Sequence, residues 1–247
     1  MKRLRIVWAL AGLAGASFAA YGRVIRPWHV RWGATDDDVR RSMPLDRIVE
    51  RPTYVTNRAV TIRAQPGEVW PWLAQIGEFP RGGFYSYDWI ERVMGMRVAS
   101  AEHILPEFQQ PQRGDALDRA GNLTVRALEP GRWLVLGPPE GQPWGDATWC
   151  LALYPADDGS SRLVSRVRVR LSRWTWAVVM FLLLDPGQFI MERRMLLGVK
   201  RRAEALAAAR QPRTTIRTAP LLSRQPHTPE EFRTACTKRL QAPARPL

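Results

Sequence analysis

The segment that most constrains the fold is a dense aromatic stretch, residues 81–91, which begins with an arginine and a pair of glycines. It reads Arg-Gly-Gly-Phe-Tyr-Ser-Tyr-Asp-Trp-Ile-Glu. The glycines let the backbone turn sharply, and aromatic side chains follow at Phe84, Tyr85, Tyr87 and Trp89. Such side chains combine a large apolar area with polar tips, which suits a pocket wall or a wedge beneath a sheet. The stretch therefore indicates a fold built around a cavity.

The charge of the chain is strongly positive. Its 247 residues, enough for one sizeable core plus tails, carry a net charge of +14, and lysine occurs only at Lys2, Lys200 and Lys238. So many arginines with so few lysines are typical of a GC-rich bacterial coding bias, and they also suit attraction to an anionic surface. The two cysteines, Cys150 and Cys236, have neither metal-ligand spacing nor a disulfide pattern.

The N-terminus carries a membrane signal. Basic residues precede an apolar stretch over residues 6–22, which is at the short end for a spanning helix. Small residues within 14–19 also offer cleavage sites for a signal peptide. We favour an uncleaved anchor, because the apolar stretch continues past those sites and then meets Trp28 and Trp32, which resemble interfacial anchors. This predicts a single-pass membrane protein with its soluble domain on the cytoplasmic face, where anionic lipid attracts positive charge.

Hydrophobic periodicity divides the rest of the chain into elements. We expect an anchor at 1–23, a polar connector at 24–52, a folded domain at 53–210 and a disordered, basic, Pro-rich tail at 211–247. Within the domain, period-2 and period-3.6 patterns predict strands at 54–64, 122–128, 133–136, 146–154 and 162–171, and helices at 65–77, 87–96 and 185–210.

Two further stretches carry alternative interpretations. Arg166, Arg168 and Arg170 alternate with apolar residues, which predicts a solvated face of the last strand, with binding of an acidic partner as the alternative. The apolar run 174–184 is too short to span a bilayer. It suits a buried segment leading into the last helix, or a second element that contacts the membrane interface.

The order of elements and three sequence segments resemble the SRPBCC superfamily (START-like, polyketide cyclase/dehydrase-like), and in particular a membrane-anchored bacterial subgroup. The segments are Ala64 to Gly77, Gly82 to Glu91, and Met191 to Glu204. The resemblance covers about residues 50–208. It implies an α+β helix-grip fold, in which a curved antiparallel sheet wraps around a long C-terminal helix and encloses an apolar cavity.

The resemblance also implies a ligand class. Members bind lipids, sterols, polyketides, quinones or other apolar small molecules, and some act as cyclases or aromatases. The side chains that we expect to line the cavity are Phe84, Tyr85, Tyr87, Trp89, Trp149, Met191 and Met195. The superfamily has no universal catalytic motif, so no catalytic residue is assigned, and the sequence shows no zinc-binding spacing or phosphate-binding loop that would indicate a metal or cofactor.

Three functions remain open at this point. The first is membrane-associated binding of a hydrophobic small molecule or lipid, through residues 6–22 and with 174–184 as a second candidate contact. The second is a polyketide cyclase-like enzyme that uses a Tyr or Asp of residues 85–91 as acid or base; Asp88 and Glu91 could share a helix face, but a cap and an exposed residue explain them more simply. The third is an interaction module built on the basic tail, although no recognition pattern for nucleic acid accompanies the charge.

Overall fold

The computed structural model describes residues 8, 12, 19–139, 141, 145–171 and 185–210. It contains a five-stranded antiparallel sheet and a long C-terminal helix, α7 (Asp185–Arg210). The α+β class expected from the sequence is confirmed. The segments 174–184 and 211–247 lie outside the described residues.

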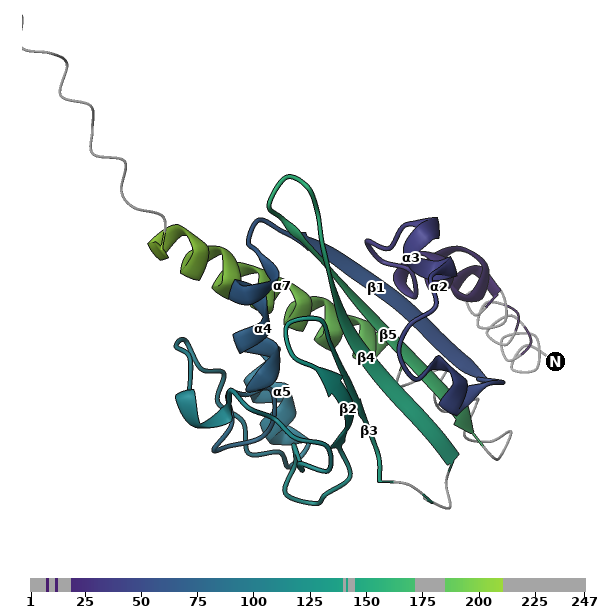
Figure 1. Ribbon diagram of the computed structural model, residues 1–247. Helices are drawn as coiled ribbons and strands as arrows, with labels where there is room; N and C mark the ends of the chain where they lie inside the picture. Colours follow the sequence, from purple (N-terminus) through teal and green to yellow (C-terminus); the bar gives the residue numbers. More distant parts are fainter. Residues whose placement is uncertain are drawn as a thin grey trace, which may run out of the picture. The chain divides into compact units, whose positions relative to one another are not determined.

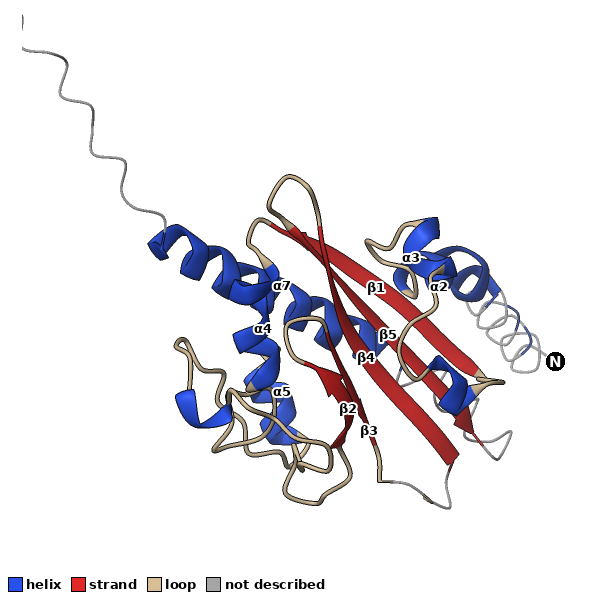
Figure 2. Cartoon of the chain, in the orientation of Figure 1, coloured by secondary structure: helices blue, strands red, loops and turns tan. Residues whose placement is uncertain are grey.

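The sheet places the first and last strands side by side. Its strands are β1 (Tyr54–Ile62), β2 (Thr124–Glu129), β3 (Trp133–Gly137), β4 (Gly145–Pro155) and β5 (Ser161–Leu171), in the spatial order β1-β5-β4-β3-β2. All five agree with the predicted strands to within a few residues. The twisted sheet and the helices that pack against it are visible in Figures 1 and 2.

Helix α7 covers one face of this sheet, which we call the inner face. Met195, Leu196, Val199 and Ala203 of α7 are buried in one cluster with side chains of β1, β4 and β5. Helix α4 (Pro66–Ala74) packs against α7 and belongs to the same cluster. The short helix α5 (Asp88–Val93) follows the aromatic stretch, as the sequence predicted.

Local sequence explains the start of α4. Gln65 and Glu68 form a reciprocal capping box, in which the Gln65 N–H donates to the Glu68 carboxylate at 2.9 Å. Pro66 occupies the first helical position, where its missing N–H costs nothing.

The contact between α7 and the aromatic stretch requires a glycine. A Cβ added at Gly198 would lie 2.4 Å from the Tyr85 carbonyl oxygen and 2.9 Å from the Tyr85 Cβ. Tyr85 itself has a φ of +57°, an uncommon conformation for a bulky residue. The close approach therefore fixes both the position and the backbone of the stretch.

We expect Gly198→Ala to lower the free energy of unfolding by about 1–3 kcal/mol, because the added methyl group must displace backbone. Chemical denaturation followed by circular dichroism measures this change. Gly187→Ala in the first turns of α7 is the control, since its Cβ would meet no atom within 4 Å. Equal effects of the two substitutions would contradict the close contact.

The opposite, outer face of the sheet is covered by the segment 24–52. Helix η1 (Tyr21–Ile25) leads into this segment, which contains α2 (Arg26–His29), α3 (Asp36–Arg40) and η2 (Asp46–Val49). Helix α3 begins with a capping box between Thr35 and Asp38. The segment also covers the free edge of β1, because the Asn57 and Ala59 N–H groups donate to the carbonyls of Val30 and Trp32 at 2.8 and 3.1 Å.

This cover corrects the expectation of a solvated arginine row on β5. Arg166 is only 4% exposed, and its guanidinium donates to the Asp46 carboxylate at 2.6 Å and to the carbonyls of Asp38 and Arg41, both at 2.8 Å. Arg168 donates to the Val49 carbonyl at 2.8 Å. Only Arg170, half exposed and paired with Asp146, meets the expectation. These arginines donate hydrogen bonds to carbonyls and a carboxylate of a segment that is far away in the sequence. The alternation of residues within one strand cannot predict such a contact.

The structure does not test the prediction that residues 6–22 anchor the chain in a membrane. Within the described ranges, no helix is both long and apolar enough to cross a membrane, but most of residues 6–22 lie outside those ranges. The described helical backbone continues through η1 and α2 to His29. Of the expected interfacial tryptophans, Trp28 is 58% exposed, whereas Trp32 packs against the core with Arg193 over its ring.

Candidate ligand site

The inner face of the sheet changes in burial along its length. Side chains that face α7 from the middle of the sheet, Leu151, Leu153 and Leu163, are at most 3% exposed. Further along the same face, Ala147, Trp149 and Val169 are only half buried. Trp149 packs against the inner cluster, as the alternation in β4 predicted. The part of the inner face around Trp149 is therefore less completely covered than the rest.

A row of polar side chains begins at this tryptophan and runs beneath α7; we call it the polar row. The Trp149 indole N–H donates to the Ser165 hydroxyl at 2.8 Å. The Ser165 hydroxyl also lowers the pKa of the Glu192 carboxyl group on α7, and Glu192 forms an ion pair with Arg58 of β1. The row thus joins β4, β5, α7 and β1.

The polar row is deeply buried and incompletely satisfied. Arg58 is 0% exposed and Glu192 5% exposed. Arg58 Nη2, Glu192 Oε1 and the neighbouring Thr56 hydroxyl find no hydrogen-bond partner in the described part of the chain. Burial raises the pKa of Glu192, and the Arg58 guanidinium opposes that shift. Buried polar atoms without partners are costly, so these three mark a place where a further polar atom would be stabilised.

A second buried cluster lies at the start of α7. Asp185 is fully buried and accepts hydrogen bonds from Tyr54 at 2.6 Å, Arg26 at 3.1 Å and Tyr21 at 3.2 Å. The His29 Nε2 lies 3.5 Å from the same carboxylate. Burial lowers the pKa of His29, and Asp185 opposes the shift. This Asp185 cluster ties the segment before β1 to α7.

Sequence reasoning missed both clusters. The partners of Asp185 are more than a hundred residues away, so no local spacing in the sequence indicates its cluster. The single signal in the sequence was an arginine, Arg58, on the apolar face of a predicted strand.

The structure places the predicted lining residues in three different environments. Phe84, Tyr85 and Met195 are at most 7% exposed and belong to the core cluster. The Tyr85 ring packs edge-on against Trp72, with centroids 6.0 Å apart, and Arg202 lies over its face. These side chains fill the interior rather than leave space in it.

Tyr87 and Met191 are half buried near the start of α7. The Ser86 hydroxyl between Tyr85 and Tyr87 donates to the Met191 carbonyl at 3.0 Å, which holds the aromatic stretch to α7. Trp89 is not brought to the interior: it is 64% exposed on α5. The helix begins at Asp88, and the change from irregular to helical backbone turns this side chain outward.

The two carboxylates of α5 also differ from expectation. Asp88 accepts hydrogen bonds from the Ser100 N–H and hydroxyl at 2.8 and 2.6 Å, so it fixes a loop. One of the two was expected to be exposed, but Glu91 is only 4% exposed and Asp88 is half buried; burial together with the nearby Asp88 raises the pKa of Glu91 to about 7.

We expect Glu91 to make stability fall as the pH rises. Below pH 4.5 the carboxyl group is protonated in both the folded and the unfolded state; between 4.5 and about 7 only the folded state keeps the proton. The loss is complete above pH 7 and reaches at most about 3 kcal/mol. Urea denaturation at pH 5 and pH 8 should show this slope removed by Glu91→Gln and unchanged by Glu107→Gln, an exposed control. An unchanged slope in Glu91→Gln would refute the assignment.

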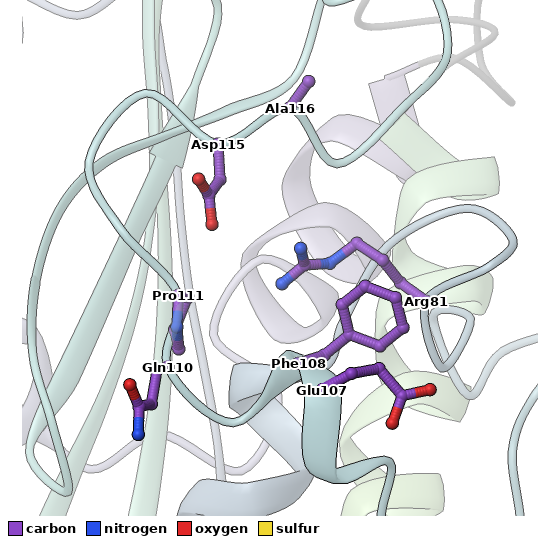
Figure 3. A pocket seen from close by; sticks show the side chains of 7 residues that line it. All are labelled: Arg81, Glu107, Phe108, Gln110, Pro111, Asp115 and Ala116. Atoms are coloured by element: carbon purple, nitrogen blue, oxygen red, sulfur yellow. The ribbon is translucent and has the colours of Figure 1, made fainter.

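A pocket of about 340 Å³ lies outside the inner face, around η3 (Pro106–Phe108). It is lined by Arg81, Glu107, Phe108, Gln110, Pro111, Asp115 and Ala116, and Figure 3 shows Arg81 and Asp115 pointing toward each other across it. Arg81 donates to the carbonyls of Ile76 and Ala74, both at 2.8 Å, and stacks over Phe108. Its main role is therefore to hold the turn before the aromatic stretch. In the described ranges, no three His, Cys, Asp or Glu side chains gather as a metal site.

Comparisons with known proteins bear on the fold alone. No family model matches the chain, and no curated protein matches its sequence. Solved structures that match include a protein from Thermobifida fusca, with 15% identity over 62% of this chain and 94% of that one and a TM-score of 0.38. A protein from Rhodobacter sphaeroides has 14% identity over 64% and 95% of the two chains, with a TM-score of 0.37.

A third match is the di-domain ARO/CYC BexL from the BE-7585A biosynthetic pathway. It has 12% identity over 61% of this chain and 46% of that chain, with a TM-score of 0.35. Such values carry no argument about this chain. Its own architecture, a five-stranded antiparallel sheet with the long C-terminal helix α7 packed on one face, agrees with the α+β arrangement that the resemblance implied.

Proposed function

We propose that this protein binds a hydrophobic small molecule or lipid on the half-buried part of the inner face, between the sheet and α7. The observation that carries the proposal is the half burial of Trp149, Ala147 and Val169 on a face whose middle, at Leu151, Leu153 and Leu163, is at most 3% exposed. Ligand sites are typically apolar walls with a few convergent polar groups. Met191 and Tyr87 supply further half-buried surface near the start of α7.

The polar row supplies the orienting groups. Arg58 Nη2 is a donor, Glu192 Oε1 an acceptor and the Thr56 hydroxyl either one. A ligand with an apolar body and a carbonyl or hydroxyl oxygen would satisfy them, whereas a pure hydrocarbon would leave them unpaired. Selectivity would then come from the position of one oxygen rather than from charge.

Association with a membrane completes the proposal. Residues 6–22 would anchor the chain, with the soluble domain on the cytoplasmic face, so that the ligand site lies near the bilayer in which such molecules dissolve. The excess of positive charge, +14, suits that anionic face.

An enzymatic, cyclase-like role has less support. Asp88 is engaged by Ser100, and the Tyr85 hydroxyl is buried, which raises its pKa and disfavours the phenolate that a base would need. The basic tail at 211–247, the basis of the interaction-module alternative, stays a prediction.

The test is native mass spectrometry of the detergent-extracted full chain, followed by organic extraction of whatever co-purifies. We expect a discrete apolar adduct that Trp149→Ala removes. Trp133→Ala is a matched control, because Trp133 is also half buried and hydrogen-bonded, to Glu129 at 2.8 Å, but packs with the outer cluster. Thr56→Val, which keeps shape and removes the hydroxyl group, should weaken binding of ketones and alcohols but not of matched hydrocarbons.

Two outcomes would overturn the proposal. One is an adduct that both tryptophan variants retain. The other is an empty protein that also rejects a panel of lipids, quinones and sterols.

A further inference from the structure

Helix α5 and the loop after it expose a group of large apolar side chains. Trp89 is 64% exposed, Val93 81% and Met94 69%. Trp89 and Val93 are four residues apart and share one side of the helix. The Phe79 N–H donates to the Arg97 carbonyl at 2.7 Å, which brings Phe79, also 64% exposed, beside this loop. In Figure 1, α5 lies on the side of the sheet opposite to α2 and α3.

The exposed charged side chains of residues 88–98 are both cationic. Of the two carboxylates of α5, Glu91 is buried and Asp88 is half buried, where it accepts hydrogen bonds from Ser100. Arg92 and Arg97 remain exposed. Arg92 donates to the Val98 carbonyl at 3.1 Å and lies 3.6 Å from Asp88, so its position is fixed while 59% of its side chain faces solvent. The exposed surface is thus aromatic, aliphatic and cationic.

We infer that this α5 surface, formed by Phe79, Trp89, Arg92, Val93, Met94 and Arg97, docks onto an anionic lipid surface. Tryptophan and arginine are favoured at lipid–water interfaces, where an apolar body sinks in and a cationic head meets phosphate. Each basic residue near an anionic leaflet adds about 1 kcal/mol of attraction. Exposed apolar side chains beside arginines, in a chain of net charge +14, are complementary to such a surface.

The geometry favours lipid over a protein partner. A stable protein interface buries about 800 Å² on each side, whereas the exposed apolar group here spans little more than one helical turn and one neighbouring loop residue. A second copy of this chain would also bring a net charge of the same sign. A bilayer needs only a shallow insertion of Trp89 and Val93 with arginines at its surface.

This inference goes beyond the proposed ligand binding and depends neither on it nor on the N-terminal anchor. An anchor attaches the chain to a membrane without fixing which face of the domain meets the lipid. The inference assigns that face. Its test must therefore report on the position of α5 itself rather than on attachment of the whole chain.

The experiment places an environment-sensitive NBD fluorophore at Val93→Cys in the full chain, with Cys236→Ser to remove the tail thiol. The protein is reconstituted into vesicles of phosphatidylcholine with or without phosphatidylglycerol. We expect a blue shift of NBD emission and quenching by spin-labelled lipid at position 93 in the anionic vesicles. A probe at Asp157→Cys, in the exposed turn between β4 and β5, should stay water-like.

Two double variants separate the apolar contribution to lipid docking from the electrostatic one. Trp89→Ser with Met94→Ser should abolish the shift, and Arg92→Gln with Arg97→Gln should reduce it to the value in phosphatidylcholine alone. A probe at position 93 that stays water-like while the protein floats with the vesicles would overturn the inference. So would a shift of equal size in both kinds of vesicle. Loss of ligand binding in the mass spectrometry experiment would leave this result unaffected.

Discussion

Replacing Arg58 by methionine should lower the free energy of unfolding by about 3–5 kcal/mol, the cost of leaving one member of a buried ion pair uncompensated. Arg58 is 0% exposed and is paired with Glu192 beneath α7. Its Nε also donates to the His29 carbonyl at 3.0 Å, so the substitution strands both a carboxylate and a carbonyl. Chemical denaturation of the full chain measures the loss.

The matched control is Arg132→Met, which removes an arginine that is 70% exposed and paired with Glu129. Exposed pairs contribute at most about 1 kcal/mol. The double variant Arg58→Met with Glu192→Met should recover most of the lost stability, since replacing both partners of a buried pair by apolar residues is often neutral. An Arg58→Met variant no less stable than Arg132→Met would show that the buried pair does not form.

The same double variant separates stability from ligand recognition. It removes two of the three unpartnered polar atoms, Arg58 Nη2 and Glu192 Oε1. If the polar row orients a ligand oxygen, the double variant should lose most of the preference for oxygenated over matched hydrocarbon ligands, with the Thr56 hydroxyl as the one orienting group left. An undiminished preference for the oxygenated ligand would assign the orientation to other groups.

The elements of the fold could be predicted because they depend on local periodicity. Alternation around Trp149 predicted its strand and its inward direction, and the stripe through Met195 predicted α7. The aromatic stretch was predicted to be a pocket wall or a wedge beneath the sheet, and its Phe84 and Tyr85 are buried in the core cluster. The burial of its individual residues could not be predicted, because the sequence pattern does not say which side of the short helix α5, where Trp89 lies, faces the core.

The polar clusters could not be predicted because they are made of distant residues. Arg58 and Glu192 are 134 residues apart, and Arg166 and Asp46 are 120 apart. An arginine in an alternating strand has the same local pattern whether water or another segment covers it. Only the packing of residues 24–52 on the outer face decides between the two.

The packing of residues 24–52 on the outer face of the sheet leads to the second prediction with a large effect on stability. Arg166→Met should lower the free energy of unfolding by about 3–5 kcal/mol, because the half-buried Asp46 carboxylate loses its nearest cation and several backbone carbonyls lose their donor. The five acceptors of this guanidinium are Asn57 Oδ1 at 2.5 Å, Asp46 Oδ2 at 2.6 Å, the Arg41 and Asp38 carbonyls at 2.8 Å, and the Val39 carbonyl at 3.0 Å.

Arg166→Met should also destabilise one part of the fold locally, since four of these acceptors belong to the segment 38–46. We expect faster amide hydrogen exchange over 36–49 and tryptic cleavage after Arg40, Arg41 or Arg47 in Arg166→Met, while β3 and β4 stay protected. Arg170→Met, on the same face of the same strand but half exposed, is the matched control. If both variants leave the segment equally protected, Arg166 does not hold it. If only Arg166→Met releases it, the segment that leads from the predicted anchor to the domain is a packed layer of the fold, whose attachment depends on one buried arginine.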